Sequence, residues 1–101
     1  MEVRISYLGK EEVVEIESPT EGEYEEFLIK LGEVESNKGN VNTGIEFYRY
    51  RRVLLLSKIK KAPFEVEVEA FKKLSVTITK KLYGALLEEM SPTADAKANF
   101  G

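Results

Sequence analysis

The residues best suited to binding chemistry form one short run, Tyr-Arg-Tyr-Arg-Arg at positions 48–52. Guanidinium groups donate paired hydrogen bonds to phosphate or carboxylate, and tyrosine rings between them can stack on nucleic-acid bases. Lysines at positions 58, 60 and 61 extend the positive charge. The candidate partner-binding residues are Tyr48, Arg49, Tyr50, Arg51, Arg52 and Lys58.

An alternative interpretation places the arginines on a solvated helix face, where they pair with glutamates of the same chain or of a second subunit. The obvious glutamate partners are Glu21, Glu23, Glu25 and Glu26. The net charge is −3, whereas nucleic-acid-binding domains are usually basic overall. We therefore expect a protein partner, and keep a small nucleic-acid-binding regulator that uses the basic helix as the alternative.

Catalytic chemistry has few suitable groups in this sequence. None of the 101 residues is Cys or His, which excludes a thiolate nucleophile, an imidazole base and cysteine-ligated metal sites. Adjacent glutamates at 11–12, 25–26 and 88–89 stand among polar residues, which favours a solvated surface over an acid–base pair. We expect no enzymatic activity, no cofactor and no metal site.

Charge is segregated along the chain. Residues 1–43 have a net charge of −7, residues 44–61 of +5 and residues 62–101 of −1. The adjacent acidic and basic segments predict self-association or docking on a charged helical partner. Glutamate supplies 17 of the 18 acidic residues, which together with the abundant lysine favours a thermophilic host.

The elements that position these residues begin with a β-hairpin. Val3, Ile5 and Tyr7 alternate with polar residues, and so do Val14 and Ile16. Gly9-Lys10 between them is typical of a tight turn. A lone hairpin is only marginally stable in water. Either the chain's own helices cover it or a second chain pairs with its open edge, which would give a homo-oligomer.

A first helix is predicted after the hairpin. Thr20 and Glu23 form a capping-box pattern, and Gly32 is a typical stop. The apolar stripe of this helix is Tyr24, Phe27, Leu28 and Leu31. The polar segment from about 33 to 42 lacks periodicity and predicts an exposed, mobile loop.

A second, more apolar helix is predicted from about 44 to 61. Thr43 and Glu46 repeat the capping-box pattern, and Pro63 ends the segment. The apolar arc is broad, which indicates the central helix of a bundle, packed on several sides. The candidate partner-binding residues all lie on this helix.

The remaining sequence predicts shorter helices. Residues 64–74 fit both a strand and a helix, and glutamates after a proline favour the helix. Ser75 is a plausible N-cap for a final helix that ends at Ser91-Pro92. Its stripe is Ile78, Leu82, Leu86 and Met90.

The predicted fold class is α+β, an N-terminal β-hairpin followed by three to four helices in a small bundle. Residues 1–92 form a single domain in this prediction, and residues 93–101 a flexible tail. The densest apolar stretch, residues 53–56, is far too short to span a membrane, and the first residues do not resemble a secretory signal.

This layout resembles a family of viral proteins. The hairpin segment at residues 7–12 (Tyr-Leu-Gly-Lys-Glu-Glu), followed by residues 18–24 (Ser-Pro-Thr-Glu-Gly-Glu-Tyr), is similar to the N-terminal region of phage-type tail assembly chaperones and related small tail or baseplate assembly proteins. Residues 54–57 and 61–65, then 71–74 and 79–83, resemble the helical end of such proteins. The resemblance covers about residues 3–90.

The resemblance implies a function in binding rather than catalysis, because the family has no catalytic residues. Such chaperones coat an aggregation-prone, mostly helical tape-measure protein and help to recruit tail-tube subunits. The implied partners are a tape-measure-type or tail-tube-type protein, and the implied location is the host cytoplasm during virus assembly.

Overall fold

The chain combines one antiparallel sheet with helices, which confirms the predicted α+β class. The computed structural model describes residues 1–37 and 39–90. Its elements, in chain order, are β1 (Glu2–Tyr7), β2 (Lys10–Ile16), α1 (Glu21–Ser36), α2 (Val41–Lys58), β3 (Ile59–Lys61), α3 (Val68–Lys72) and α4 (Val76–Glu89). The predicted tail at residues 93–101 lies outside the described residues.

The predicted hairpin is confirmed, but its turn lies one residue earlier than expected. Tyr7 pairs with Lys10, so Leu8 and Gly9 form the two-residue turn. Both have positive φ, 51° for Leu8 and 78° for Gly9, as a type I′ turn requires. A leucine in this left-handed conformation costs about 1 kcal/mol, which Asn or Gly would largely avoid.

The sheet has a third strand that the sequence analysis assigned to the end of the second helix. Helix α2 stops at Lys58, and residues 59–61 pair antiparallel with β2. The backbone N–H of Glu17 donates to the carbonyl of Lys58 at 2.7 Å, which joins the two segments where the helix ends. Pairing with β2 therefore overrides the local helical preference of the Ile-Lys-Lys sequence.

Helix α1 begins as predicted and ends later than predicted. Thr20 and Glu23 form the full capping box. The helix continues through Gly32 to Ser36, because Leu31 and Val34 are partly buried along it, and helix packing outweighs the roughly 1 kcal/mol cost of an interior glycine. The predicted loop at 33–42 is accordingly much shorter.

Helix α2 also begins earlier than predicted. Its N-cap is Asn40, whose side-chain oxygen accepts from the backbone N–H groups of Asn42 and Thr43. The predicted capping box at Thr43 is therefore wrong. Asparagine is as good an N-cap as threonine, and the earlier start adds a turn to the helix.

The C-terminal helices agree better with the prediction. The ambiguous segment contains only the five-residue α3, and Ser75 caps α4 by accepting from the N–H of Ile78. All four residues of the predicted α4 stripe are buried. Helix α4 packs against β1 and α2, so it forms the floor of the core.

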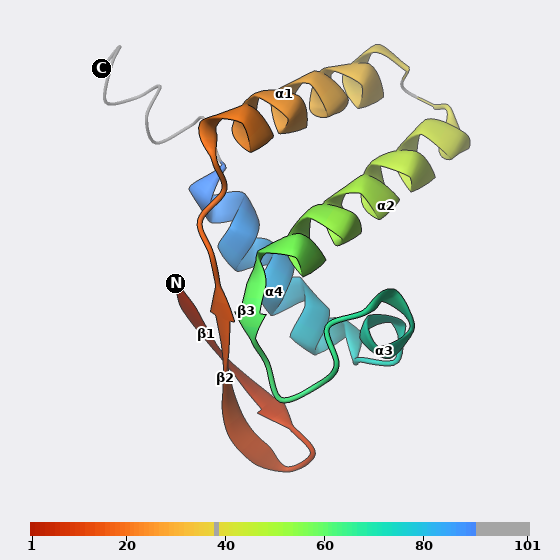
Figure 1. Ribbon diagram of the computed structural model, residues 1–101. Helices are drawn as coiled ribbons and strands as arrows, with labels where there is room; N and C mark the ends of the chain where they lie inside the picture. Colours follow the sequence, from red (N-terminus) through yellow and green to blue (C-terminus); the bar gives the residue numbers. More distant parts are fainter. Residues whose placement is uncertain (38, 91–101) are drawn as a thin grey trace.

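Helices α1 and α2 form an antiparallel helical hairpin that extends away from the sheet and α4 (Figure 1). The base of α2 is buried through Leu54 and Leu55, whereas Val41 and Ile45 in its first half are exposed. Helix α2 contacts α1, α3 and α4, as expected of a helix packed on several sides, but one face of its first half is exposed. Its first half is covered by α1 on one side, with Phe27 and Phe47 in contact at 5.7 Å between ring centroids.

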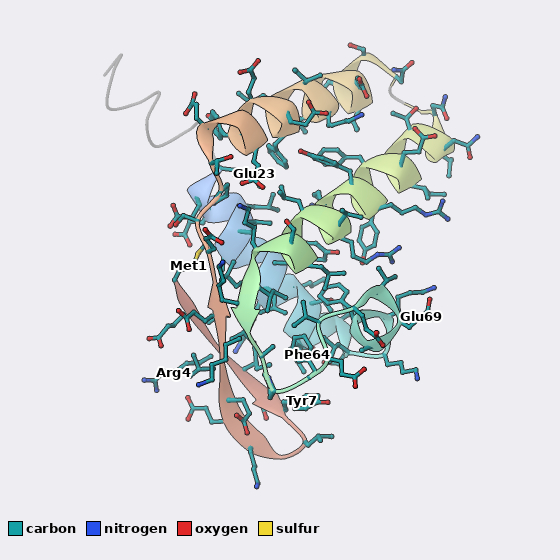
Figure 2. The ribbon with its side chains drawn as sticks, viewed as in Figure 1. Met1, Arg4, Tyr7, Glu23, Phe64 and Glu69 are labelled. Carbon is teal, nitrogen blue, oxygen red and sulfur yellow. The ribbon has the colours of Figure 1, made fainter. Side chains whose placement is uncertain are left out.

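The base of the helical hairpin is held by a buried lysine. Lys58 is only 7% exposed, and its Nζ lies 2.5 Å from Oε1 of Glu23. Glu23, at the start of α1 (Figure 2), also caps that helix, so one carboxylate joins the start of α1 to the end of α2. Beside it, Lys60 on β3 pairs with Glu17 at 2.8 Å. These two ion pairs fix the junction of sheet and helical hairpin.

Glu23→Gln tests this junction. Glutamine still serves in a capping box, but it leaves the buried Lys58 ammonium without a counter-charge. We expect a loss of about 2 kcal/mol in the free energy of unfolding, measured by urea denaturation. Glu25→Gln on the exposed surface of the same helix is the matched control and should change stability by less than about 0.5 kcal/mol.

Acid should weaken the same junction. Hydrogen bonds from Lys58 and from the Thr20 backbone lower the pKa of Glu23, and the hydrogen bond from Lys60 lowers the pKa of Glu17, both from 4.5. Their stabilising contribution is present above pH 4.5 and is lost as the pH falls through the lowered values. The melting temperature should therefore drop more steeply below pH 4.5 in the wild type than in Glu23→Gln, and equal slopes would contradict the assignment.

Candidate interaction site on helix α2

The six candidate residues do not form one patch, because consecutive helical residues point about 100° apart. Tyr48 and Arg49 are exposed, whereas Tyr50, Arg51 and Arg52 are partly buried. Lys58 is buried in its ion pair with Glu23 and is not available on the surface.

Arg51 is the centre of an aromatic cluster. Its guanidinium lies 5.4 Å from the ring centroid of Phe47, 5.6 Å from that of Tyr48 and 5.2 Å from that of Tyr83. Tyr83 comes from α4 and packs edge-on against Phe71 of α3 at 5.8 Å. Each cation–π contact contributes about 0.5–1 kcal/mol, so Arg51 attaches α2 to α4 rather than reaching a partner.

Polar atoms in this cluster lack partners within the described residues. The Nε atoms of Arg51 and Arg52 and the hydroxyl of Tyr83 are buried without a hydrogen bond. Burial is the main cause that raises the pKa of Tyr83 from 10.0 to about 12, and the nearby Tyr48 hydroxyl is the second. The cluster is therefore a positively charged, poorly hydrated region between α2 and α4.

The expected pairing of the arginines with N-terminal glutamates is absent from the described part of the chain. Among residues 1–37 and 39–90, no ion pair joins Arg49, Arg51 or Arg52 to a carboxylate. Of the four glutamates expected as partners, Glu21, Glu23, Glu25 and Glu26, Glu23 pairs with Lys58 instead. Arg51 is engaged by aromatic rings, so Arg49 and Arg52 are the arginines whose charge no carboxylate among the described residues balances.

An exposed apolar stripe runs along α2 next to these arginines. Val41, Ile45 and Tyr48 are exposed by 73%, 44% and 46%. Together with Arg52 they are spaced four, three and four residues apart, which places them on one helix face. We call this set, Val41, Ile45, Tyr48 and Arg52, the α2 stripe. Its spacing is that of a helix that packs on another helix.

Arg49 lies on the other side of α2, in the groove between α1 and α2. This groove has a volume of about 290 Å³, and Lys30, Glu33 and Val53 also line it. Lys30 and Glu33 form an exposed pair at 4.0 Å. The groove is small and of mixed charge, so it has less capacity for a partner than the α2 stripe.

Two parts of this site were not predicted from the sequence. They are the exposure of Ile45 and Tyr48, on a helix expected to be packed on several sides, and the contact of Tyr83 with Arg51. The heptad-like spacing of Val41, Ile45 and Tyr48 was visible in the sequence. Its exposure was not, because exposure depends on which faces of α2 the other helices cover.

Two other classes of function would need a metal site or a membrane-spanning helix. No group of three or more His, Cys, Asp or Glu side chains in residues 1–37 and 39–90 is placed to hold a metal ion. No helix in the same ranges is long and apolar enough to cross a membrane. Comparison with protein-family models, with curated proteins and with solved structures finds no match to this chain.

Tyr83→Phe tests the buried hydroxyl. Phenylalanine keeps the ring contacts and removes a polar atom that has no partner, so the free energy of unfolding at pH 7 should stay the same or rise by up to about 1 kcal/mol. In the wild type, the unfolded chain ionises this tyrosine near pH 10 and the folded chain only near pH 12, so stability should fall between these values. Tyr83→Phe should reduce that alkaline loss in urea denaturation, and strong destabilisation at pH 7 would contradict the assignment.

Proposed function

We propose that this protein is a non-enzymatic assembly protein that binds an amphipathic, acidic helix of a protein client on the α2 stripe. The observation that carries the proposal is the exposed, heptad-spaced stripe beside arginines that have no carboxylate partner among the described residues. Exposed apolar surface of this kind is typical of protein-binding sites, and its helical spacing suits a helical partner.

The geometry of the helical hairpin supports the proposal. The Lys58–Glu23 ion pair holds the base of α2, and Arg51 holds its middle against α4. The exposed face of α2 is therefore already ordered before a partner binds. A preorganised surface loses less entropy on binding. Acidic side chains of the client would pair with Arg52 and fix the orientation of the client helix on α2.

The class of client comes from the resemblance to tail assembly chaperones. A tape-measure-type protein is long and mostly helical, so it offers many copies of the kind of surface that the α2 stripe suits. We propose such a protein, or a tail-tube subunit, as the client, in a virus of a hot environment, with assembly in the host cytoplasm. Self-association remains compatible with the segregated charge.

Ile45→Glu tests the proposal. The chain is co-expressed with the large helical protein encoded beside it, and the pair is purified at low salt through a tag on the client. We expect Ile45→Glu to reduce the recovered chain about tenfold or more, because it places a charge in the centre of an apolar interface. Circular dichroism should show an unchanged fold, since Ile45 is exposed.

Ile29→Glu is the matched control. Ile29 is an exposed isoleucine on α1, 51% accessible, and it lies on the side of that helix turned away from the Phe27 contact with α2. The control should leave recovery of the chain unchanged. Equal loss in both variants, or no recovery of the wild-type chain at low salt, would contradict the proposal.

Nucleic-acid binding is the second candidate, favoured by the same unpaired arginines next to the exposed ring of Tyr48. It predicts a gel shift that weakens steeply with salt and is lost in an Arg49→Gln, Arg52→Gln double variant. The helix-binding proposal predicts no shift at physiological salt.

A further inference from the structure

A second surface, remote from the α2 stripe, lies between the tip of the β-hairpin and α3. It is a cleft of about 600 Å³, larger than the groove between α1 and α2. The hairpin tip contributes Tyr7 and Leu8, and the opposite wall is the segment from Phe64 through α3 to the start of α4. Figure 2 shows Tyr7 and Phe64 together at one end of this region and Glu69 on the α3 side.

The floor of the cleft is apolar. Ile78 is buried there, and Ala70 and Leu74 are partly buried. Tyr7 and Phe64 close one end with an edge-on ring contact at 5.9 Å between centroids. A floor of this kind can accept one apolar side chain of a ligand.

Leu8 is the most unusual residue of the cleft. It is 84% exposed, more than any other large apolar residue in the described part of the chain, and it has a left-handed backbone at φ 51°. Asparagine or glycine would suit this turn position better, and a polar residue would suit its exposure better. A strained, exposed leucine at the mouth of an apolar cleft points to contact with a ligand.

The rim of the cleft is acidic. Glu65, Glu67 and Glu69 are all exposed on the α3 side, against the single basic side chain of Lys73. Glu69 is 4.0 Å from Lys72, and the carboxylates of Glu65 and Glu67 have no ion-pair partner among the described residues. Two unpaired carboxylates beside an apolar floor complement a segment that carries Lys or Arg next to an apolar side chain.

We propose that the cleft between the hairpin tip and α3 is a second docking site, which takes a basic segment of a protein partner with one apolar anchor. The anchor packs under Leu8 and against Phe64, and flanking Lys or Arg side chains pair with Glu65 and Glu67. This site is independent of the α2 stripe, which has the opposite charge preference.

A second acidic hollow shows why charge alone does not define the site. It lies on the sheet, has a volume of about 320 Å³ and is lined by Glu2, Glu11, Glu12, Val13, Glu15 and Lys61. Its lining includes one apolar side chain, and Glu11 already pairs with Arg4 at 3.4 Å. It has no apolar floor for an anchor and therefore serves as the internal control.

The test uses the full chain labelled with nitrogen-15 and the synthetic peptide acetyl-Lys-Leu-Lys-Phe-Lys-amide as the probe. Amide shifts in the proton–nitrogen spectrum are followed during the titration. We expect saturable shifts confined to the hairpin tip and to residues 64–78. An acidic probe, acetyl-Glu-Leu-Glu-Phe-Glu-amide, should cause none there.

Leu8→Asn is the decisive variant, because it keeps the turn and removes the anchor contact. It should fold at least as stably as the wild type and yet bind the probe about fivefold more weakly, since apolar contact area is lost. A Glu65→Gln, Glu67→Gln double variant should weaken binding similarly, whereas a Glu11→Gln, Glu12→Gln double variant should not.

Five results would overturn the proposal, and four of them come from the peptide titration. They are the absence of saturable shifts, shifts centred on the sheet hollow or on α2, wild-type affinity in Leu8→Asn, and equal weakening in both glutamine double variants. Shifts that depend on protein concentration without any peptide would instead identify a second copy of the chain as the occupant, and would also overturn it.

Discussion

The ion pair between Lys58 and Glu23 is the interaction on which the arrangement depends. A lysine that is 7% exposed needs a counter-charge, and the nearest one is the carboxylate that caps α1. The pair lies where α1 starts and α2 ends, next to the point at which the chain enters β3. The helical hairpin extends outward from this point, so the pair joins its two helices at their base.

The same constraint explains how charge is divided between structure and binding. The sequence has an acidic N-terminal segment and a basic central one, but only part of that charge is used internally. Lys58 forms an ion pair with Glu23, and Lys60 forms one with Glu17. No arginine of α2 forms an ion pair with a carboxylate in the described part of the chain. The charged side chains that form ion pairs within the chain lie at the base of the helical hairpin. The arginines without a carboxylate partner lie along α2.

Local patterns predicted the elements that depend on nearest neighbours. The alternation of apolar and polar residues predicted the hairpin, and the Thr20 capping box predicted the start of α1. The helical spacing of apolar residues predicted the buried stripe of α4. The failures involve long-range contacts: β3 forms only because β2 lies beside it, and α1 passes Gly32 because α2 packs on it. For the site, the residue types were predictable. The burial of Lys58 and the contact between Arg51 and Tyr83 were not, because the first depends on how α1 meets the end of α2 and the second on how α4 packs against α2.

The central claim is that a client helix lies along the exposed face of α2. Site-specific photocrosslinking measures this directly, with benzoylphenylalanine placed at position 45 in one variant and at position 29 in another, each co-expressed with the neighbouring large helical protein. A covalent adduct with that protein from position 45 and none from position 29 is the predicted result. Adducts from position 29 alone, or from neither position while the two proteins copurify, would contradict the claim.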